Sequence, residues 1–353
     1  MNVSIRAFAF LLGVVCGFVP ATMAAPTASS ASPAAAVRTY PAKSGDTLAS
    51  LARQFGISIR QLQAANHLET ETELRPGQSL KIPAPASRHS LWKAEGRQST
   101  VYLLGSVHAL TAEDYPLPRV IEGAFTNAAI VAFEADIEAL ETLETQQKIM
   151  SKAMLPPGET LKQQLSPEVY SRLAAHLHES GLSPEMFATF KPSMAAFLLV
   201  TTEMLKLGLE PQYGLDKHFF RRSREEHKQL EFLETVDLQI GMVTDFTKEE
   251  GELMLKTELR DMEKMKKELP ELVRAWEIGD ARVLEKLLNE AVQEAPVIFK
   301  RLLTDRNRRW MTPLEGWLRG DRNVLMVVGA GHLVGSEGLV ELLRKKGWKV
   351  TQQ

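Results

Sequence analysis

The chain has 353 residues, of which 44% are hydrophobic, and this length is enough for one large domain with a smaller unit beside it. Its formal net charge of −2 is close to balance and no basic tract stands out, which argues against nucleic acid as a partner. The one cysteine, Cys16, lies in an N-terminal apolar stretch, so a chain that has lost this stretch has no disulfide and no cysteine metal site.

The first 24 residues are typical of a secretory signal peptide. Arg6 supplies a positive charge, an apolar run from Ala7 to Val19 follows, and Thr22-Met23-Ala24 offers small residues for cleavage. The run is too short to span a membrane, and no later stretch reaches the length of a membrane helix. We therefore expect export across the inner membrane to the periplasm or cell envelope, and a retained N-terminal anchor is the alternative.

Two linkers divide the rest of the chain. Residues 25–38 are rich in alanine, serine and proline, which predicts a flexible tether. Residues 84–90 have the composition of a second, shorter linker. These linkers leave a small unit at 39–83 and a large domain at 91–353.

The small unit is predicted to contain a strand, two helices and a second strand. A polar turn precedes a helix over 48–55, with Asp46 or Thr47 as its cap. A second helix is expected over 59–66, and a Pro-Gly turn leads into a strand at 79–82.

The segments SGDTLASLARQFG, IRQLQAANHL and LRPGQSLKIP of the small unit resemble a LysM module along its whole length. The resemblance implies binding of glycans that contain N-acetylglucosamine, chiefly peptidoglycan. It places the glycan groove near two loops, with Gly45, Asp46, Thr47 and Asn66 as candidate contacts. A degenerate module kept only as a spacer is the alternative.

The large domain begins with apolar strands separated by helices. LWKAEG and STVYLLGSVH predict two strands joined by a polar turn, and a helix is expected over about 118–128. Further strands are expected at 130–133, 230–233 and 324–328. Strands that alternate with helices predict an α/β fold whose sheet has a substantial parallel component.

Four of these strands end just before a histidine or a glutamate, namely His108, Glu134, Glu234 and His332. Each histidine closes a G-x-x-H motif, in which Gly105 or Gly329 lets the chain bend sharply. Ligands of such sheets gather outside the carboxyl ends of the strands. We therefore expect the four side chains to face one crevice.

Two imidazoles and one or two carboxylates suit a divalent transition metal such as manganese, cobalt, zinc or iron. In this interpretation His108, His332 and Glu134 bind the metal, which activates water or a carbonyl group, and Glu234 is a spare general base. The alternative is that each histidine is a hydrogen-bonded structural residue and that the glutamates cap the helices after them.

In chain order, LWKAEG, YLLGSVHAL, FEAD, YGLD, FLET, DRNRRW and VVGAGHLVGSEGLVELLRKKGW resemble the TraB/GumN family, which is related to the Tiki proteins. The resemblance covers about residues 91–351. It implies a Tiki-like fold, a mixed sheet with a largely helical insertion, which haem-uptake and erythromycin-esterase relatives share. It also implies metal-dependent peptide cleavage by two G-x-x-H motifs and a glutamate, which fall on Gly105 and His108, on Gly329 and His332, and on Glu134.

Three further residues are candidates for the site. Asp216 follows Tyr213-Gly214-Leu215 and is either a site residue or the cap of the next helix. Arg306 and Asn307, to which we assign a catalytic role, lie in a long helical segment. An arginine there can hold a substrate carboxylate or an oxyanion, and a solvated helix face is the alternative.

The remaining histidines have no matching partner in the sequence. His176 and His178 point to different faces of one helix and are expected on the surface. The others are expected to be structural or exposed, or belong to the small unit and the second linker: His218, His227, His67 and His89.

The region from about 136 to 318 is mostly helical by its period, and an amphipathic helix is expected over 248–268. We expect this insertion to cover the crevice and to shape substrate access. Together these features predict a metal-dependent envelope hydrolase of the peptidase or amidase type, held at peptidoglycan by its LysM module. The main alternative is a binding protein that sequesters a peptide signal or a haem-like ligand, and a purely structural wall-associated domain is the third.

Overall fold

The computed structural model describes residues 38–69 and 72–353. The predicted signal peptide, and the predicted tether up to residue 37, lie outside the described residues. Within the described part of the chain, no helix is both long and apolar enough to cross a membrane.

The small N-terminal domain has the predicted order of a strand, two helices and a strand: β1 (Arg38–Pro41), α2 (Leu48–Phe55), α3 (Ile59–Asn66) and β2 (Ser79–Ile82). Strand β1 pairs antiparallel with β2 and begins at Arg38, the last residue of the predicted tether. Thr47 caps α2 through its side chain, and Gly56 ends that helix in the left-handed region. The domain has a small apolar core of its own, built around Leu51 and Leu62.

The large domain is built on one six-stranded sheet in the order β6-β5-β7-β4-β3-β8. Its strands are β3 (Leu91–Glu95), β4 (Thr100–Ser106), β5 (Ile130–Phe133), β6 (Gln229–Phe232), β7 (Val324–Gly329) and β8 (Lys349–Gln352). The strands β6, β5, β7 and β4 run parallel, whereas β3 is antiparallel to both β4 and β8. The predicted mixed sheet, with its parallel component, is confirmed.

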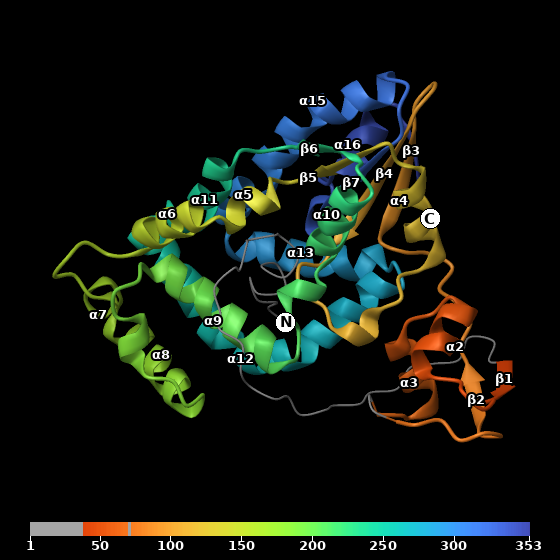
Figure 1. Ribbon diagram of the computed structural model, residues 1–353. Helices are drawn as coiled ribbons and strands as arrows, with labels where there is room; N and C mark the ends of the chain where they lie inside the picture. The colour runs from red at the N-terminus through yellow and green to blue at the C-terminus, as the bar shows by residue number, and fades with distance from the viewer. Residues whose placement is uncertain (1–37, 70–71) are drawn as a thin grey trace.

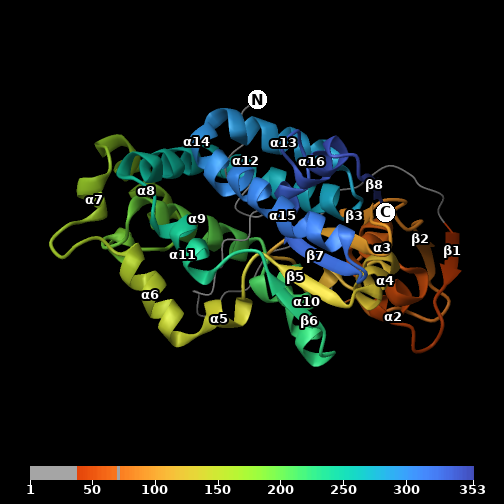
Figure 2. The ribbon, with the colours of Figure 1, turned by 90° about the horizontal axis from the view of Figure 1, so that it is seen from above.

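Helices cover both faces of the sheet. Figures 1 and 2 show α15 and α16 on one face and α4 and α10 on the other. Their bounds are α4 (Arg119–Asn127), α10 (Leu215–Glu225), α15 (Asp305–Arg319) and α16 (Leu339–Lys345). Short turns of helix lie beside them at η1 (Ala112–Asp114), η3 (Pro211–Tyr213) and η5 (Ala330–His332).

The helical insertion extends away from the sheet, and α9 packs along α12 within it (Figure 1). It contains α5 (Ile137–Glu141), α6 (Leu143–Ala153), α7 (Leu161–Gln164), α8 (Pro167–Glu179), η2 (Pro184–Phe187), α9 (Pro192–Lys206), α11 (Val236–Thr244), α12 (Lys248–Glu277), α13 (Ala281–Glu294), α14 (Pro296–Phe299) and η4 (Lys300–Thr304). The predicted amphipathic helix is therefore present as α12 but runs nine residues further, to Glu277. Its apolar stripe, including Leu255 and Leu259, is buried as expected.

The two G-x-x-H segments lie side by side because β4 and β7 are neighbouring parallel strands. Gly105 stands opposite Val328, and Ser106 stands opposite Gly329. A Cβ atom at Gly105 would come within 3.0 Å of the Ala330 Cβ. The glycine therefore allows the backbone after β7 to pass close to β4.

The small domain rests against the large one. The Arg60 Nε lies 2.6 Å from Asp114 Oδ1, and the Ile59 N–H donates to the Tyr115 carbonyl. The predicted linker 84–90 ends inside the large domain, because His89 and Ser90 are buried and the Ser90 hydroxyl donates to the Trp276 carbonyl.

Candidate functional site

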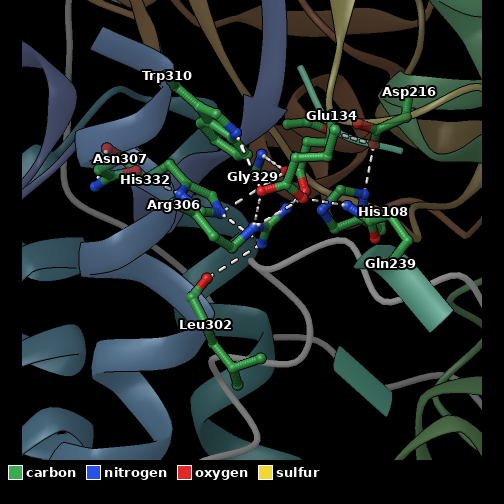
Figure 3. A network of polar contacts seen from close by, with 12 residues as sticks. His108, Glu134, Asp216, Gln239, Leu302, Arg306, Asn307, Trp310, Gly329 and His332 are labelled. Carbon is green, nitrogen blue, oxygen red and sulfur yellow. Dashed lines mark hydrogen bonds and ion pairs between the residues drawn. The ribbon is translucent and has the colours of Figure 1, made fainter. Parts of the chain in front are cut away.

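The four strand ends converge, as the sequence predicts. His108 follows β4, Glu134 follows β5, Glu234 follows β6 and His332 lies in η5 after β7. The Glu234 N–H donates to the Glu134 carbonyl at 2.8 Å, which ties two of these ends together. Figure 3 shows that the labelled His108, Glu134 and His332 side chains point into one polar network.

His108 is held by a carboxylate on one side and is unpaired on the other. Its Nδ1 lies 2.6 Å from Asp216 Oδ2, and the Ser106 hydroxyl donates to the same carboxylate oxygen. Within the described part of the chain, the buried Nε2 of His108 has no hydrogen-bond partner. Such an unpaired buried nitrogen is costly and calls for an explanation.

Two opposing effects set the protonation of His108. Burial lowers the pKa of its imidazole, but the carboxylate of Asp216 and, less strongly, that of Glu134 raise it, and the pKa lies above its ordinary value. Asp216 therefore fixes the orientation of the ring and stabilises its protonated form.

Arg306 is the centre of a buried charge network, with a side chain that is 1% exposed. Its NH2 donates to Glu134 Oε2 at 2.5 Å, and its Nε donates to Glu234 Oε1 at 3.0 Å. Its NH1 donates to the Leu302 carbonyl at 3.1 Å. One guanidinium thus pairs with two buried carboxylates, and their charges raise its pKa against the effect of burial.

His332 is fully buried and is kept neutral by its surroundings. Its Nδ1–H donates to Asn307 Oδ1 at 2.6 Å, while its Nε2 accepts from Arg306 NH1 at 3.1 Å. Its ring packs on that of Trp310, with centroids 4.3 Å apart. Burial, followed by the positive charge of Arg306, lowers the pKa of His332 well below its ordinary value.

A small pocket that is partly open to solvent lies beside this network and is called the cavity below. His108, Glu134, Asp216 and Gln239 line one end of it. Four other predicted site residues, Glu234, Arg306, Asn307 and His332, do not line the cavity and lie behind that end. The site therefore consists of residues that line the cavity and of buried residues behind them.

The structure decides between the alternatives left open for the acidic residues. Asp136 caps α5 and Thr235 caps α11, so Glu134 and Glu234 do not act as helix caps. Asp216 lies in the first turn of α10 and pairs with His108 instead of capping the helix.

Arg306 and Asn307 are both buried on α15, so a solvated helix face is excluded for them. Asn307 also donates from Nδ2 to the His332 and Glu337 carbonyls, which fixes the loop that carries His332. The second motif glycine has a direct contact too, because the Gly329 N–H donates to Glu134 Oε1 at 2.8 Å.

Three contributing residues were not predicted: Ser106, Gln239 and Trp310. Trp310 is four residues after Arg306 on the same helix face, and its Nε1–H donates to Glu234 Oε1 at 3.1 Å, so helical spacing could have found it. Ser106 lies inside the first G-x-x-H motif. Gln239, which donates to Glu234 Oε2, lies in the helical insertion and has no signal in the sequence.

Of the two histidines expected on the surface, His178 is exposed and His176 is only partly exposed. The His176 Nε2 lies 3.0 Å from Glu203 Oε1, a carboxylate that is 5% exposed. His218 packs against Tyr115 and Phe219, and burial lowers its pKa to about 4.

The four candidate glycan contacts lie in the small domain. Gly45 and Thr47 are exposed in the loop before α2, where Gly45 has a φ of 86°. Asp46 Oδ2 accepts from the Lys43 N–H, and the Asn66 side chain pairs with both main-chain groups of Lys81. The structure thus gives Asp46 and Asn66 internal roles, and their contact with a glycan stays a prediction.

The donor atoms fit a metal site only in part. Both histidines have Nδ1 held by a polar partner and Nε2 turned inward, which is common in metal-binding histidines. However, no three His, Asp or Glu groups in residues 38–69 and 72–353 are close enough to hold a metal ion. The guanidinium of Arg306 contacts both Glu134 and His332, so a preformed metal site does not fit this arrangement.

Comparisons with known proteins agree with the two-domain division. A model of the TraB/PrgY/gumN family matches residues 90–352, and a model of the LysM domain matches residues 40–83. No solved structure matches the chain.

Three relatives show how far the similarity extends. The chain is 26% identical to the uncharacterized protein YbaP of Escherichia coli over 266 residues, which cover 75% of this chain and 92% of that protein. It is 21% identical to a metalloprotease TIKI homolog of Nematostella vectensis over 314 residues, or 74% of this chain and 66% of that one. Over 50 residues, 14% of this chain and 17% of the other, it is 46% identical to the N-acetylmuramoyl-L-alanine amidase XlyA of Bacillus subtilis.

Proposed function

The chain belongs to the TraB/PrgY/gumN family and carries a peptidoglycan-binding type of domain, LysM, before the family domain; from this we propose that it is a hydrolase of amide or peptide bonds that works at the cell wall. The observation that carries the proposal is the buried Nε2 of His108, which has no partner among the described residues, on a residue that lines the cavity. Export to the cell envelope is part of the same proposal.

The reaction follows from the geometry of His108. In its neutral form, Nε2 takes a proton from a water molecule while the water oxygen attacks the carbonyl carbon of the substrate. The same nitrogen then gives the proton to the leaving nitrogen as the C–N bond breaks, so a carboxylic acid and an amine are released. Asp216 accepts from Nδ1–H and stabilises the imidazolium between the two steps.

One relative, which matches 74% of this chain, supports hydrolysis through its name, a metalloprotease homolog. The sequence predicts a divalent metal, manganese, cobalt or zinc, but the described residues form no site for it. No step of the proposed reaction passes through it, because Arg306 lies against the residues that would bind it.

The test is a search for cleavage products by mass spectrometry. The full-length protein is incubated with purified muropeptides and with a mixture of synthetic peptides. We expect products from the wild type and a loss of roughly 10²–10⁴-fold in rate for His108→Ala, since a general base contributes about that much. The control His178→Ala removes an exposed histidine and should keep the full rate. Equal rates for His108→Ala and the wild type would disprove the proposed base.

A second function is favoured by the same cavity. Apolar walls with one unpaired imidazole nitrogen are also what a haem needs, as an axial ligand in an apolar pocket. If the protein is a binding protein for such a ligand, added haemin gives a stoichiometric shift of the haem absorption band that His108→Ala abolishes, and no product forms from any peptide.

A further inference from the structure

The cavity beside His108 has polar residues near His108, and most of its other lining residues are apolar. Beyond His108, Glu134, Asp216 and Gln239, its walls include Phe133 and Leu140, which are 1% and 2% exposed. The facing wall is helix α9, which contributes Phe197, Val200, Thr201 and Met204. A chain that fills this space therefore has one end beside His108 and most of its length against hydrocarbon.

These walls do not suit the polymer that LysM modules bind. Peptidoglycan stem peptides carry short or charged side chains, and its glycan strands are covered with hydroxyl groups. Either would leave polar groups in the cavity without partners, which costs about 1–3 kcal/mol for each group. Lys217, which also lines the cavity, is already paired with Glu141 at 2.5 Å.

We propose that the cavity is a subsite for an apolar chain of the substrate, next to the bond that is cleaved, and that LysM holds the protein at the wall without presenting wall polymer to this subsite. The apolar chain is either a large hydrophobic amino-acid side chain or an acyl group. The binding part of this inference stands without turnover, and its effect on substrate choice rests on the proposed hydrolysis.

Two residues of α9 set the length of chain that fits. Thr201 is 6% exposed, and its hydroxyl donates back to the Phe197 carbonyl at 2.8 Å, so it presents a small side chain to the cavity. Met204 lies one turn further along the same wall and is partly buried. The neighbouring Thr202 makes the same kind of bond, to the Leu198 carbonyl, but does not line the cavity. It is a matched control.

The experiment combines binding with turnover in the full-length protein. Binding is followed by the fluorescence of dansylundecanoic acid, an apolar chain with a polar end. Turnover is measured with acetylated peptide p-nitroanilides that have alanine, leucine, lysine or glutamate before the cleaved bond. It is also measured with p-nitrophenyl esters from acetate to dodecanoate and with muropeptides. The variants are Thr201→Phe, which fills the subsite, Thr202→Phe as the control, and Met204→Ala, which enlarges it.

We expect the wild type and Thr202→Phe to bind the dansyl probe and Thr201→Phe to lose at least about tenfold in affinity, since a filled pocket loses several methylene contacts. We also expect a preference for leucine over alanine of about tenfold or more, which Thr201→Phe reduces and Met204→Ala shifts toward longer chains. A leucine preference with slow ester cleavage assigns the chain to a peptide, and the reverse assigns it to an acyl group.

The outcomes separate this inference from the proposed function. Turnover without a preference for apolar chains, or with a preference for muropeptides, overturns the subsite but leaves the hydrolase. Probe binding that Thr201→Phe weakens, without any turnover, supports the subsite and overturns the hydrolase. Equal probe binding by Thr201→Phe and Thr202→Phe overturns the subsite whether or not the protein is a hydrolase. If Thr201→Phe does not fold, the shift in Met204→Ala decides.

Discussion

At the scale of single residues, the two motif histidines have different surroundings and therefore different chemistry. His108 faces the cavity and keeps one nitrogen free, whereas His332 is 0% exposed and has both nitrogens paired. The sequence presents them as equivalent G-x-x-H motifs. The difference arises because Arg306 and Asn307 come from α15, far along the chain, and reach only His332.

Arg306 pairs with the buried carboxylates of Glu134 and Glu234 and so stabilises the fold around the cavity. We expect Arg306→Met to lower the free energy of unfolding by about 3–5 kcal/mol, because it leaves Glu134 and Glu234 buried without their counter-charge. Urea unfolding measures this loss. The matched change Arg308→Met removes a cation that is 62% exposed and should cost no more than about 1 kcal/mol. Similar losses for both variants would contradict the assigned role of Arg306.

The sequence predicts those residues of the candidate site that directly follow a strand. His108, Glu134, Glu234 and His332 each follow a strand, so the parallel sheet alone brings them together. Which of them faces the cavity was not predictable, because α9 and α15 decide it and their packing has no local signal. Asp216 was left between two roles for the same reason, and its contact with His108 settles the choice.

At the scale of elements, the turn before α10 positions His108 without touching its ring. A Cβ atom on Gly214 would lie 2.2 Å from the His108 carbonyl oxygen, so a side chain there must move the His108 backbone. We expect Gly214→Ala to lower turnover by about 100-fold, since a misplacement of about 1 Å can cost that much.

The control for this change is Gly123→Ala in α4. A Cβ atom there has no atom within 4 Å, and alanine favours a helix over glycine by about 1 kcal/mol. Turnover should stay at the wild-type rate and the melting temperature should rise. If Gly214→Ala also keeps the wild-type rate, the backbone of His108 does not need this glycine.

The strands of the large domain show what local patterns can predict. Continuous apolar runs place β4, β5 and β7 within one or two residues, because all three are buried on both faces. Strand β8 has four residues, mostly exposed or half-buried, and forms by pairing with β3 at the edge of the sheet. No pattern in its own sequence predicts it.

At the scale of the whole molecule, a series of contacts connects the small domain to the candidate site. The Ser58 hydroxyl donates to Glu277 Oε1 at 2.5 Å across the domain contact. The residue before Glu277, Trp276, donates from Nε1 to the Gly105 carbonyl at 2.7 Å, at the end of β4. Helix α12 thus joins the LysM domain to the strand that carries His108.

Glu277 makes this contact depend on pH. Burial raises the pKa of its carboxyl to about 7, the Ser58 hydrogen bond opposes the rise, and Asp114 adds to it while Arg60 and Arg274 oppose it. The folded pKa therefore exceeds the ordinary value of 4.5, so the stabilisation is complete below pH 4.5 and is lost as the pH rises through about 7. Because the side chain is partly exposed, the loss should be on the order of 1–2 kcal/mol.

The measurement is the free energy of unfolding at pH 5 and pH 8. We expect Glu277→Gln, which keeps the side chain neutral, to lose less stability between these pH values than the wild type. The control Glu271→Gln changes an exposed glutamate of the same helix and should follow the wild type. A wild-type slope that Glu277→Gln leaves unchanged would show that Glu277 does not carry this pH dependence.

In the proposed reaction His108 is the base, positioned by Asp216, and no preformed metal site takes part. The most direct measurement is the initial rate of peptide cleavage by the wild type before and after removal of metals with a chelator, beside that of His108→Ala. We expect the chelated wild type to keep its rate and His108→Ala to lose roughly 10²–10⁴-fold. Loss of the wild-type rate on chelation, with recovery on adding manganese, cobalt or zinc, would contradict it.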